Sequence, residues 1–197
     1  MSAASAATSP AGGRRGALVA LGVVLVVAAW LRIEALDRGV FAHPENYAPG
    51  FDDPSWVTAP YPRRTTLEGV LRGNLADGHP PLWFVAMLPW VRAFGTGLTA
   101  LRLPSALAGT ATVALLFLFV RRRSPAWIAA LAAALLALHG AHVFWSRLAR
   151  MYAAATLLGA AASWLLLRLL DGGRRRDAVA YVLAAAALAW TQIYGFA

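Results

Sequence analysis

Long apolar stretches bounded by arginine are the feature that most constrains this chain. All eighteen of its Lys and Arg residues are arginine, and arginine triplets end two of the stretches, at residues 121–123 and 174–176. Seven of its nine acidic residues lie between the first stretch and the second, from Glu34 to Asp77. Charge that is segregated around apolar runs of about 20 residues is typical of proteins with several transmembrane helices. We therefore predict an all-α polytopic membrane fold.

Five transmembrane helices are predicted from the lengths of the apolar stretches. They cover residues 16–36, 102–120, 125–145, 152–170 and a last stretch that begins near Ala178. Because arginine is enriched on the cytoplasmic side of membrane proteins, Arg14-Arg15 and both triplets are assigned to the cytoplasm. The assignment alternates correctly with five spans, and it makes residues 37–101 one long loop on the outer face of a plasma (inner) membrane.

The N-terminus and one loop segment differ from the predicted spans. Residues 1–15 are small and polar, and we expect them to form a disordered cytoplasmic segment ahead of one membrane domain, residues 16–197. The first apolar stretch also resembles a signal peptide, but several spans follow it, so we interpret it as a retained helix. Residues 80–95 are apolar but short and contain three prolines. They predict an interfacial or re-entrant amphipathic helix on the outer surface.

The composition excludes several classes of protein. A formal net charge of +9 would suggest nucleic-acid binding in a water-soluble protein. Here 59% of the residues are hydrophobic and the arginines flank apolar spans, so we expect contact with anionic headgroups and no nucleic acid. The absence of cysteine excludes disulfides, thiolate metal sites and a cysteine nucleophile.

An adjacent carboxylate pair, Asp52-Asp53, lies in the outer loop beside aromatic residues. Two neighbouring acids can divide the work of a base, one remaining ionised while the other orients it. The spacing alone also fits helix capping, because Asp followed by Pro54 is a good N-cap with proline at the first helical position. Both interpretations stay open from the residues themselves.

Three further segments offer candidate side chains on the same face. His79 lies in a turn with two prolines, where it could contact an anionic group or serve only the turn. Arg147 and Arg150 precede Tyr152 in a short outer turn, where the positive-inside rule disfavours arginine. The planar guanidinium suits a lipid phosphate, and pairing with the loop acids is the alternative. Arg102 begins a span on the outer side, where it could also simply extend to the interface.

His139 and His142 are three residues apart near the outer end of the third span. This spacing allows a metal site, but without a third ligand a structural pair at a helix end is favoured. We predict no bound metal and no cofactor, although the aspartate pair could hold a divalent cation.

Together, three motifs resemble the N-terminal part of GT-C glycosyltransferases, the protein O-mannosyltransferases, the aminoarabinose transferases and their bacterial relatives. The first motif is Asp77-Gly78-His79-Pro80-Pro81-Leu82-Trp83, which runs into Trp90 and Phe94-Gly95. The second is Leu101-Arg102-Leu103-Pro104-Ser105-Ala106-Leu107-Ala108-Gly109, and the third is Trp145-Ser146-Arg147-Leu148-Ala149-Arg150-Met151-Tyr152-Ala153. The resemblance covers about residues 17–197 and well under half of a typical family member.

The resemblance implies a function and roles for these residues. A sugar would pass from a polyprenyl-phosphate donor to an acceptor lipid, glycan or protein on the outer face, with inversion at the anomeric carbon. Asp52 or Asp53 matches the position of the family's acidic pair, which is usually Asp-Glu, and would act as general base. Arg147 and Arg150 would bind the donor phosphate, and His79, Arg102 and Tyr152 would position the loop or substrate.

Two further expectations follow. Since such enzymes build their donor pocket partly from later helices, we expect these 197 residues alone to be inactive. The alternative function is a non-catalytic membrane scaffold or a fragment of a transporter. A transporter predicts ionisable residues near the bilayer midplane, whereas the charges here gather at the ends of the spans.

Overall fold

The computed structural model describes residues 10–38 and 66–192, without the side chains of residues 10–15 and 75–77. Every regular element in these ranges is an α-helix, which confirms the predicted all-α fold. The helices are α1 (Pro10–Ile33), α2 (Leu67–Asp77), α3 (Leu82–Phe94), α4 (Leu98–Arg121), α5 (Ala126–Leu138), α6 (Gly140–Ser146), α7 (Tyr152–Leu170) and α8 (Arg175–Thr191).

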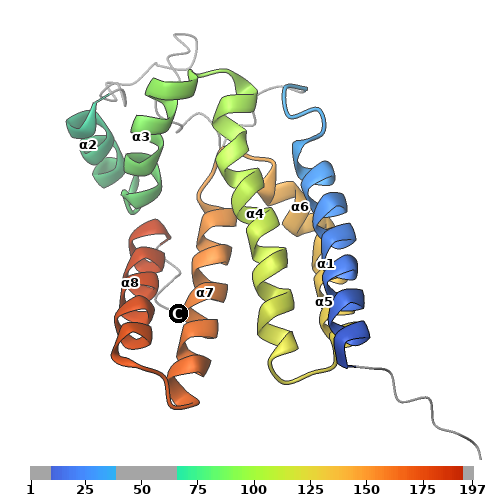
Figure 1. Cartoon of the computed structure of the whole chain (residues 1–197). Coiled ribbons are helices and arrows are strands. Elements are labelled where there is room, and N and C mark those ends of the chain that lie inside the picture. Colours follow the sequence, from blue (N-terminus) through green and yellow to red (C-terminus); the bar gives the residue numbers. More distant parts are fainter. Residues whose placement is uncertain (1–9, 39–65, 193–197) are drawn as a thin grey trace, which may run out of the picture.

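Long helices lie side by side in a bundle, and α2 and α3 lie together at one end of it (Figure 1). One end of the bundle, named the arginine end, comprises the turns at residues 121–125 and 171–174. The opposite end, named the loop end, comprises residues 34–38, 78–81 and 147–151. The beginning of α1 lies at the arginine end (Figure 1). The helix begins at Pro10, so it extends into the segment predicted to be disordered.

Three of the described helices are long and apolar enough to cross a membrane: α1 from Gly16, α4 and α7. The bounds of α7 are those predicted, and α4 contains the predicted span 102–120. The bent pair α5–α6 adds a fourth candidate. Within the described residues α8 has 17 residues and is not among the candidate spans, so a fifth span is not seen there.

The third predicted span is broken rather than continuous. Helix α5 ends at Leu138, His139 takes an extended conformation with ψ of 112°, and α6 begins at Gly140. The two axes differ in direction by 62°. The apolar run therefore had the right length for one span, but its backbone turns at His139.

Small side chains allow the bundle helices to pack closely. One buried cluster between α1, α4 and α5 contains mostly alanine, with two larger residues from α4. Its members are Ala28, Val113, Phe117, Ala129, Ala133 and Ala137. Close approach of backbones through small residues is the usual way in which transmembrane helices associate, because lipid provides no hydrophobic drive between them.

Helix α3 lies inside the segment predicted as a surface helix, and it packs against α2, α4 and α8. Its contact with α4 has a specific cause. Pro104 has no backbone N–H, so the carbonyl of Ala100 four residues earlier lacks its helical partner. The indole Nε1 of Trp90 in α3 donates to that carbonyl at 2.7 Å. This bond fixes α3 beside the first turns of α4.

The arginine end is held by ion pairs between its two turns. Arg122 and Arg123 each approach the carboxylate of Asp171 at 2.7 Å. Asp177 pairs with Arg168 at 2.7 Å and accepts from the backbone N of Arg174 at 2.9 Å. Both arginine triplets thus lie at one end of the bundle, as their assignment to one side of the membrane requires. Which side this is stays a prediction.

Candidate functional site

The loop end brings together candidate residues from two separate motifs. Arg150, in the turn between α6 and α7, is 4% exposed. Its Nη2 lies 3.3 Å from Nε2 of His79, in the turn between α2 and α3. The sequence placed these residues on one face but not in contact. The two residues are 71 positions apart along the chain, and the packing of α3 against the bundle brings them together.

Tyr152 completes this group at the first residue of α7. The guanidinium carbon of Arg150 lies 5.6 Å from the centre of the tyrosine ring, within the range of a cation–π contact. The ring also packs against Trp145, with ring centres 4.5 Å apart. His79, Arg150 and Tyr152 are named the His-Arg-Tyr cluster below.

The backbone of Arg150 is positioned by α4 and by a buried apolar cluster. Ser105 is fully buried, and its Oγ donates to the carbonyl oxygen of Arg150 at 3.0 Å. The neighbours Ala149 and Met151 are buried against α2, α3 and α4 together with Phe84. A residue between two buried neighbours, with its own carbonyl bound, has little freedom to move. The backbone of Arg150 is therefore held in place, and its guanidinium contacts His79 and Tyr152.

Arg102 and Arg147 serve a different purpose in this structure. Nη1 of Arg102 donates to the carbonyls of Leu36 at 2.9 Å and Arg38 at 3.2 Å. Arg147 donates to the carbonyls of Leu31 at 2.8 Å and Ala35 at 3.3 Å. Leu31 lies in the last turn of α1, where carbonyls lack their usual helical partners, and the other three carbonyls follow the helix. That of Ala35 also accepts from the backbone N of Arg38 at 3.1 Å. The two arginines therefore hold the segment that leads into the predicted outer loop.

That segment carries one strained residue. Ala35 has a φ of 51°, in the left-handed region that normally holds glycine after a helix. For an alanine this conformation costs about 1–2 kcal/mol. It persists because neighbouring contacts, including the bond from Arg147, fix the chain there.

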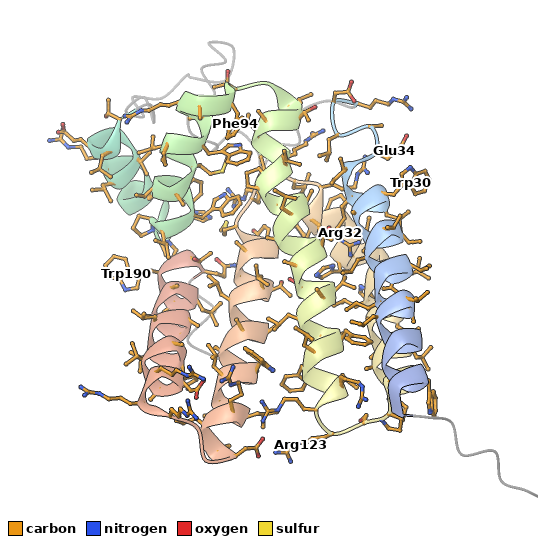
Figure 2. The ribbon with its side chains drawn as sticks, viewed as in Figure 1. Trp30, Arg32, Glu34, Phe94, Arg123 and Trp190 are labelled. Carbon is orange, nitrogen blue, oxygen red and sulfur yellow. The ribbon has the colours of Figure 1, made fainter. Side chains whose placement is uncertain are left out.

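A buried arginine that the sequence did not single out lies at the end of α1. Arg32 is fully buried and points into the bundle, whereas Trp30 points away (Figure 2). Its guanidinium donates to the carbonyls of Ala28 at 2.9 Å and Ala137 at 3.2 Å. Its Nη2 lies 2.9 Å from Nδ1 of His142. One signal was available: an arginine at the outer end of an apolar span violates the positive-inside rule.

The two histidines near the break act at a helix end. His139 is the N-cap of α6, and its Nδ1 accepts from the backbone N of His142 at 3.3 Å. Among the described residues, no group of three or more His, Asp or Glu side chains is arranged to hold a metal ion. The geometry agrees with the structural interpretation of the pair.

The predicted catalytic carboxylates, Asp52 and Asp53, lie outside the described residues. Their roles, and their use as a cation site, stay predictions. The structure describes the chain up to residue 38 and again from residue 66. The end of the segment after α1 and the start of α2 both lie at the end of the bundle where α2 and α3 lie (Figure 1).

Comparison with known proteins gives one match. Residues 78–193 match the family described as dolichyl-phosphate-mannose-protein mannosyltransferase. The comparison with curated proteins and the comparison with solved structures find no significant match. The matched region begins at the turn that carries His79 and also contains Arg102, Arg147, Arg150 and Tyr152. It does not include Asp52 or Asp53.

The family has the GT-C fold, and its members are membrane glycosyltransferases with a lipid-linked sugar donor. The all-α bundle of apolar helices agrees with that fold. The matched region covers more than half of the chain. This chain therefore belongs to the dolichyl-phosphate-mannose-protein mannosyltransferase family.

Proposed function

We propose that the protein transfers a sugar from a polyprenyl-phosphate donor to an acceptor on the outer face of a plasma membrane. The observation that carries this proposal is the His-Arg-Tyr cluster at the loop end. It supplies a buried guanidinium beside an imidazole and a phenol ring. The family supplies the reaction class, and the cluster supplies a place for the donor phosphate.

Two sources of positive potential converge on this place. A guanidinium is always charged in proteins, and its fork of N–H groups matches phosphate oxygens. Arg150 also lies just before the N-terminus of α7, where the first backbone N–H groups have no helical partners and the helix dipole is positive. An anion at this position is favoured by both, and the surrounding apolar cluster lowers the local screening.

We assign the phosphate first to Arg150 and only then to Arg147. A phosphate at Arg147 would compete with the carbonyls of Leu31 and Ala35, which this side chain already holds. Arg102 is similarly engaged, because its Nη1 donates to the carbonyls of Leu36 and Arg38, so we propose that it positions the loop. Tyr152 and His79 then orient the guanidinium and the phosphate.

The proposed reaction is a direct displacement. Asp52, or failing that Asp53, removes the proton from the acceptor hydroxyl, whose oxygen attacks the anomeric carbon of the donor sugar. The bond from that carbon to the phosphate oxygen breaks, and the configuration inverts. Polyprenyl phosphate leaves with the bonding electrons, and Arg150 stabilises the charge that develops on it.

The test separates binding from chemistry in the full-length protein, purified in detergent. Arg150→Gln should weaken the binding of polyprenyl phosphate, the expected leaving group, by on the order of tenfold or more, since it removes a charged hydrogen-bond donor. Asp52→Asn or Asp53→Asn should leave that binding intact but abolish transfer from polyprenyl-phosphate mannose.

Arg92→Gln is the matched control, because Arg92 lies on the exposed face of α3. It should change neither quantity. Unaltered binding by Arg150→Gln would overturn the phosphate assignment, and full transfer by both aspartate variants would overturn the assignment of the base.

A further inference from the structure

The break between α5 and α6 creates a specific problem inside the bundle. In a continuous helix, the carbonyls of Leu136 and Ala137 would accept from the N–H groups four residues later. The extended conformation of His139 removes both bonds, and the carbonyl of Leu136 keeps only a turn bond from the backbone N of His139 at 3.3 Å. An unsatisfied carbonyl at membrane depth costs several kcal/mol, so broken helices need substitute donors.

Arg32 supplies those donors from another helix. Its Nη1 donates to the carbonyl of Ala137 at 3.2 Å, and its Nη2 reaches that of Leu136 at 3.5 Å. These contacts join residues more than 100 positions apart in the sequence. The side chain is fully buried, and so it acts as a C-terminal cap for α5 that is built from α1.

The same guanidinium also binds the helix beyond the break. Its Nη2 lies 2.9 Å from Nδ1 of His142. Because arginine can only donate, Nδ1 must accept, which places the ring proton of His142 on Nε2. Ser146, one turn later, donates from Oγ to the carbonyl of His142 at 2.5 Å. Arg32 thus holds the end of α5 and the start of α6 at one angle.

Helix α4 closes this joint from the other side. A Cβ at Gly109 would overlap Oγ of Ser146 and would lie 2.6 Å from its Cβ and 3.2 Å from Nε of Arg32. Only glycine leaves room for α1, α4 and α6 to meet here. The joint of Arg32, Gly109, His142 and Ser146 is therefore a packed unit.

The direction of α6 decides where Arg150 lies. Three residues separate Ser146, the last residue of α6, from Arg150, and two of them, Leu148 and Ala149, are buried. We infer that Arg32 is a positioning residue for donor binding: by capping α5 and holding His142, it directs α6 so that Arg150 meets His79. This inference rests on the proposed function of Arg150 and adds a residue that contacts no substrate.

The first test is a double-mutant cycle on the affinity of the full-length protein for polyprenyl phosphate. Arg32→Met should weaken binding by on the order of tenfold, because a displaced guanidinium no longer matches the phosphate. In the double variant with Arg150→Gln, Arg32→Met should add nothing further. Arg32→Lys retains a charged donor and should restore part of the affinity. If the fold losses of affinity in the two single variants multiply in the double variant, the inference is overturned.

The control is Arg168→Met. Arg168 is also a partly buried arginine, but it pairs with Asp177 at the arginine end. Its loss should leave the affinity for polyprenyl phosphate unchanged, in the single variant and with Arg150→Gln. A reduced affinity in this control equal to that of Arg32→Met would show a general loss of structure and would overturn the inference.

A second measurement does not depend on the donor. These 197 residues contain no cysteine, so Leu131→Cys in α5 and Phe144→Cys in α6, both at exposed positions, accept spin labels selectively. Pulsed EPR should give one narrow distance distribution, which Arg32→Met should shift or broaden and Arg168→Met should not. A distance distribution that Arg32→Met leaves unchanged would overturn the inference. An Arg150→Gln variant with unchanged affinity for polyprenyl phosphate would overturn only the proposed function.

A variant pair at His142 covers the case in which Arg32→Met does not fold. His142→Asn keeps an acceptor near the position of Nδ1, and His142→Leu removes it. The asparagine variant should retain the narrow distribution and the affinity, and the leucine variant should lose both. Equal behaviour of the two variants would overturn the role of this contact.

Discussion

The two ends of the bundle use arginine in opposite ways. At the arginine end, Arg122 and Arg123 are partly or largely exposed and pair with the carboxylate of Asp171. At the loop end, Arg32 and Arg102 are buried and donate to backbone carbonyls, Arg32 to those of α5 and Arg102 to those of the segment after α1. One residue type thus forms ion pairs in water at one end and replaces missing helical hydrogen bonds at the other.

This difference teaches how much each charge matters to the fold. An exposed ion pair gains little, because water solvates both partners and salt screens them. A buried carbonyl that loses its donor cannot form a hydrogen bond with water instead, so the protein loses stability by the full cost of desolvating that carbonyl. The triplets can therefore serve to orient the protein, whereas the buried arginines at the loop end are required for its structure.

The largest effect on stability is expected for Arg102→Met. It leaves the carbonyls of Leu36 and Arg38 without this donor, and hydrogen bonds to charged groups each contribute about 1.5–3 kcal/mol. We expect the free energy of unfolding in mixed micelles to fall by about 3 kcal/mol. Arg72→Met is the control, since Arg72 is exposed and pairs only with Glu68 in the described part of α2, and it should change stability by less than about 0.5 kcal/mol. Similar losses of stability in both variants would contradict the difference between buried arginines that bind carbonyls and exposed arginines that form ion pairs.

Gly109→Ala should have the next largest effect. The added methyl overlaps Ser146 inside the joint, and overpacking of a tight core costs about 1–3 kcal/mol. Gly159→Ala is a matched control in α7, where the new Cβ would lie 3.8 Å from Leu188, an ordinary contact. That variant should be neutral or stabilising by up to about 1 kcal/mol, because alanine favours helix. Equal stability of the two variants, measured by thermal unfolding in detergent, would contradict the close approach at Gly109.

Asp171→Asn should have the smallest effect and sharpens the comparison. It removes the shared partner of Arg122 and Arg123, and exposed ion pairs contribute about 0.2–1 kcal/mol each. The loss should shrink as the salt concentration rises, because added ions screen the wild-type pairs. Unfolding measured at low and high salt checks this. A loss of stability above about 2 kcal/mol that does not depend on salt would show that arginine contacts at the arginine end contribute as much to stability as those at the loop end.

Much of the helical architecture could be predicted from local sequence. Apolar length located α7 to the residue and placed the span of α4, because a membrane-crossing helix must satisfy all its backbone groups within itself. Residues 80–95 were also separated correctly from the spans as a shorter helix. The position of the break at His139 could not be predicted, since it depends on donors from a residue more than 100 positions away.

The candidate site divides in the same way. His79, Arg150 and Tyr152 were chosen from motifs, and the structure brings them into contact. Arg147 was expected to bind phosphate or loop acids, and in the structure it donates to the carbonyls of Leu31, in α1, and Ala35, just after it. No pattern in the sequence distinguishes an arginine that binds a ligand from one that caps a neighbouring helix, because both need the same long, charged donor.

By itself, the sequence determined that this protein is an all-α membrane protein with its arginine triplets at one end, because apolar length and charge act locally along the chain. The family motifs, too, are visible in the sequence. Only the tertiary structure decided which arginines are buried, where the third span breaks and which side chain meets His79. These depend on how α1, α4 and α6 pack around Gly109, and such packing is set by contacts between residues that are distant in sequence.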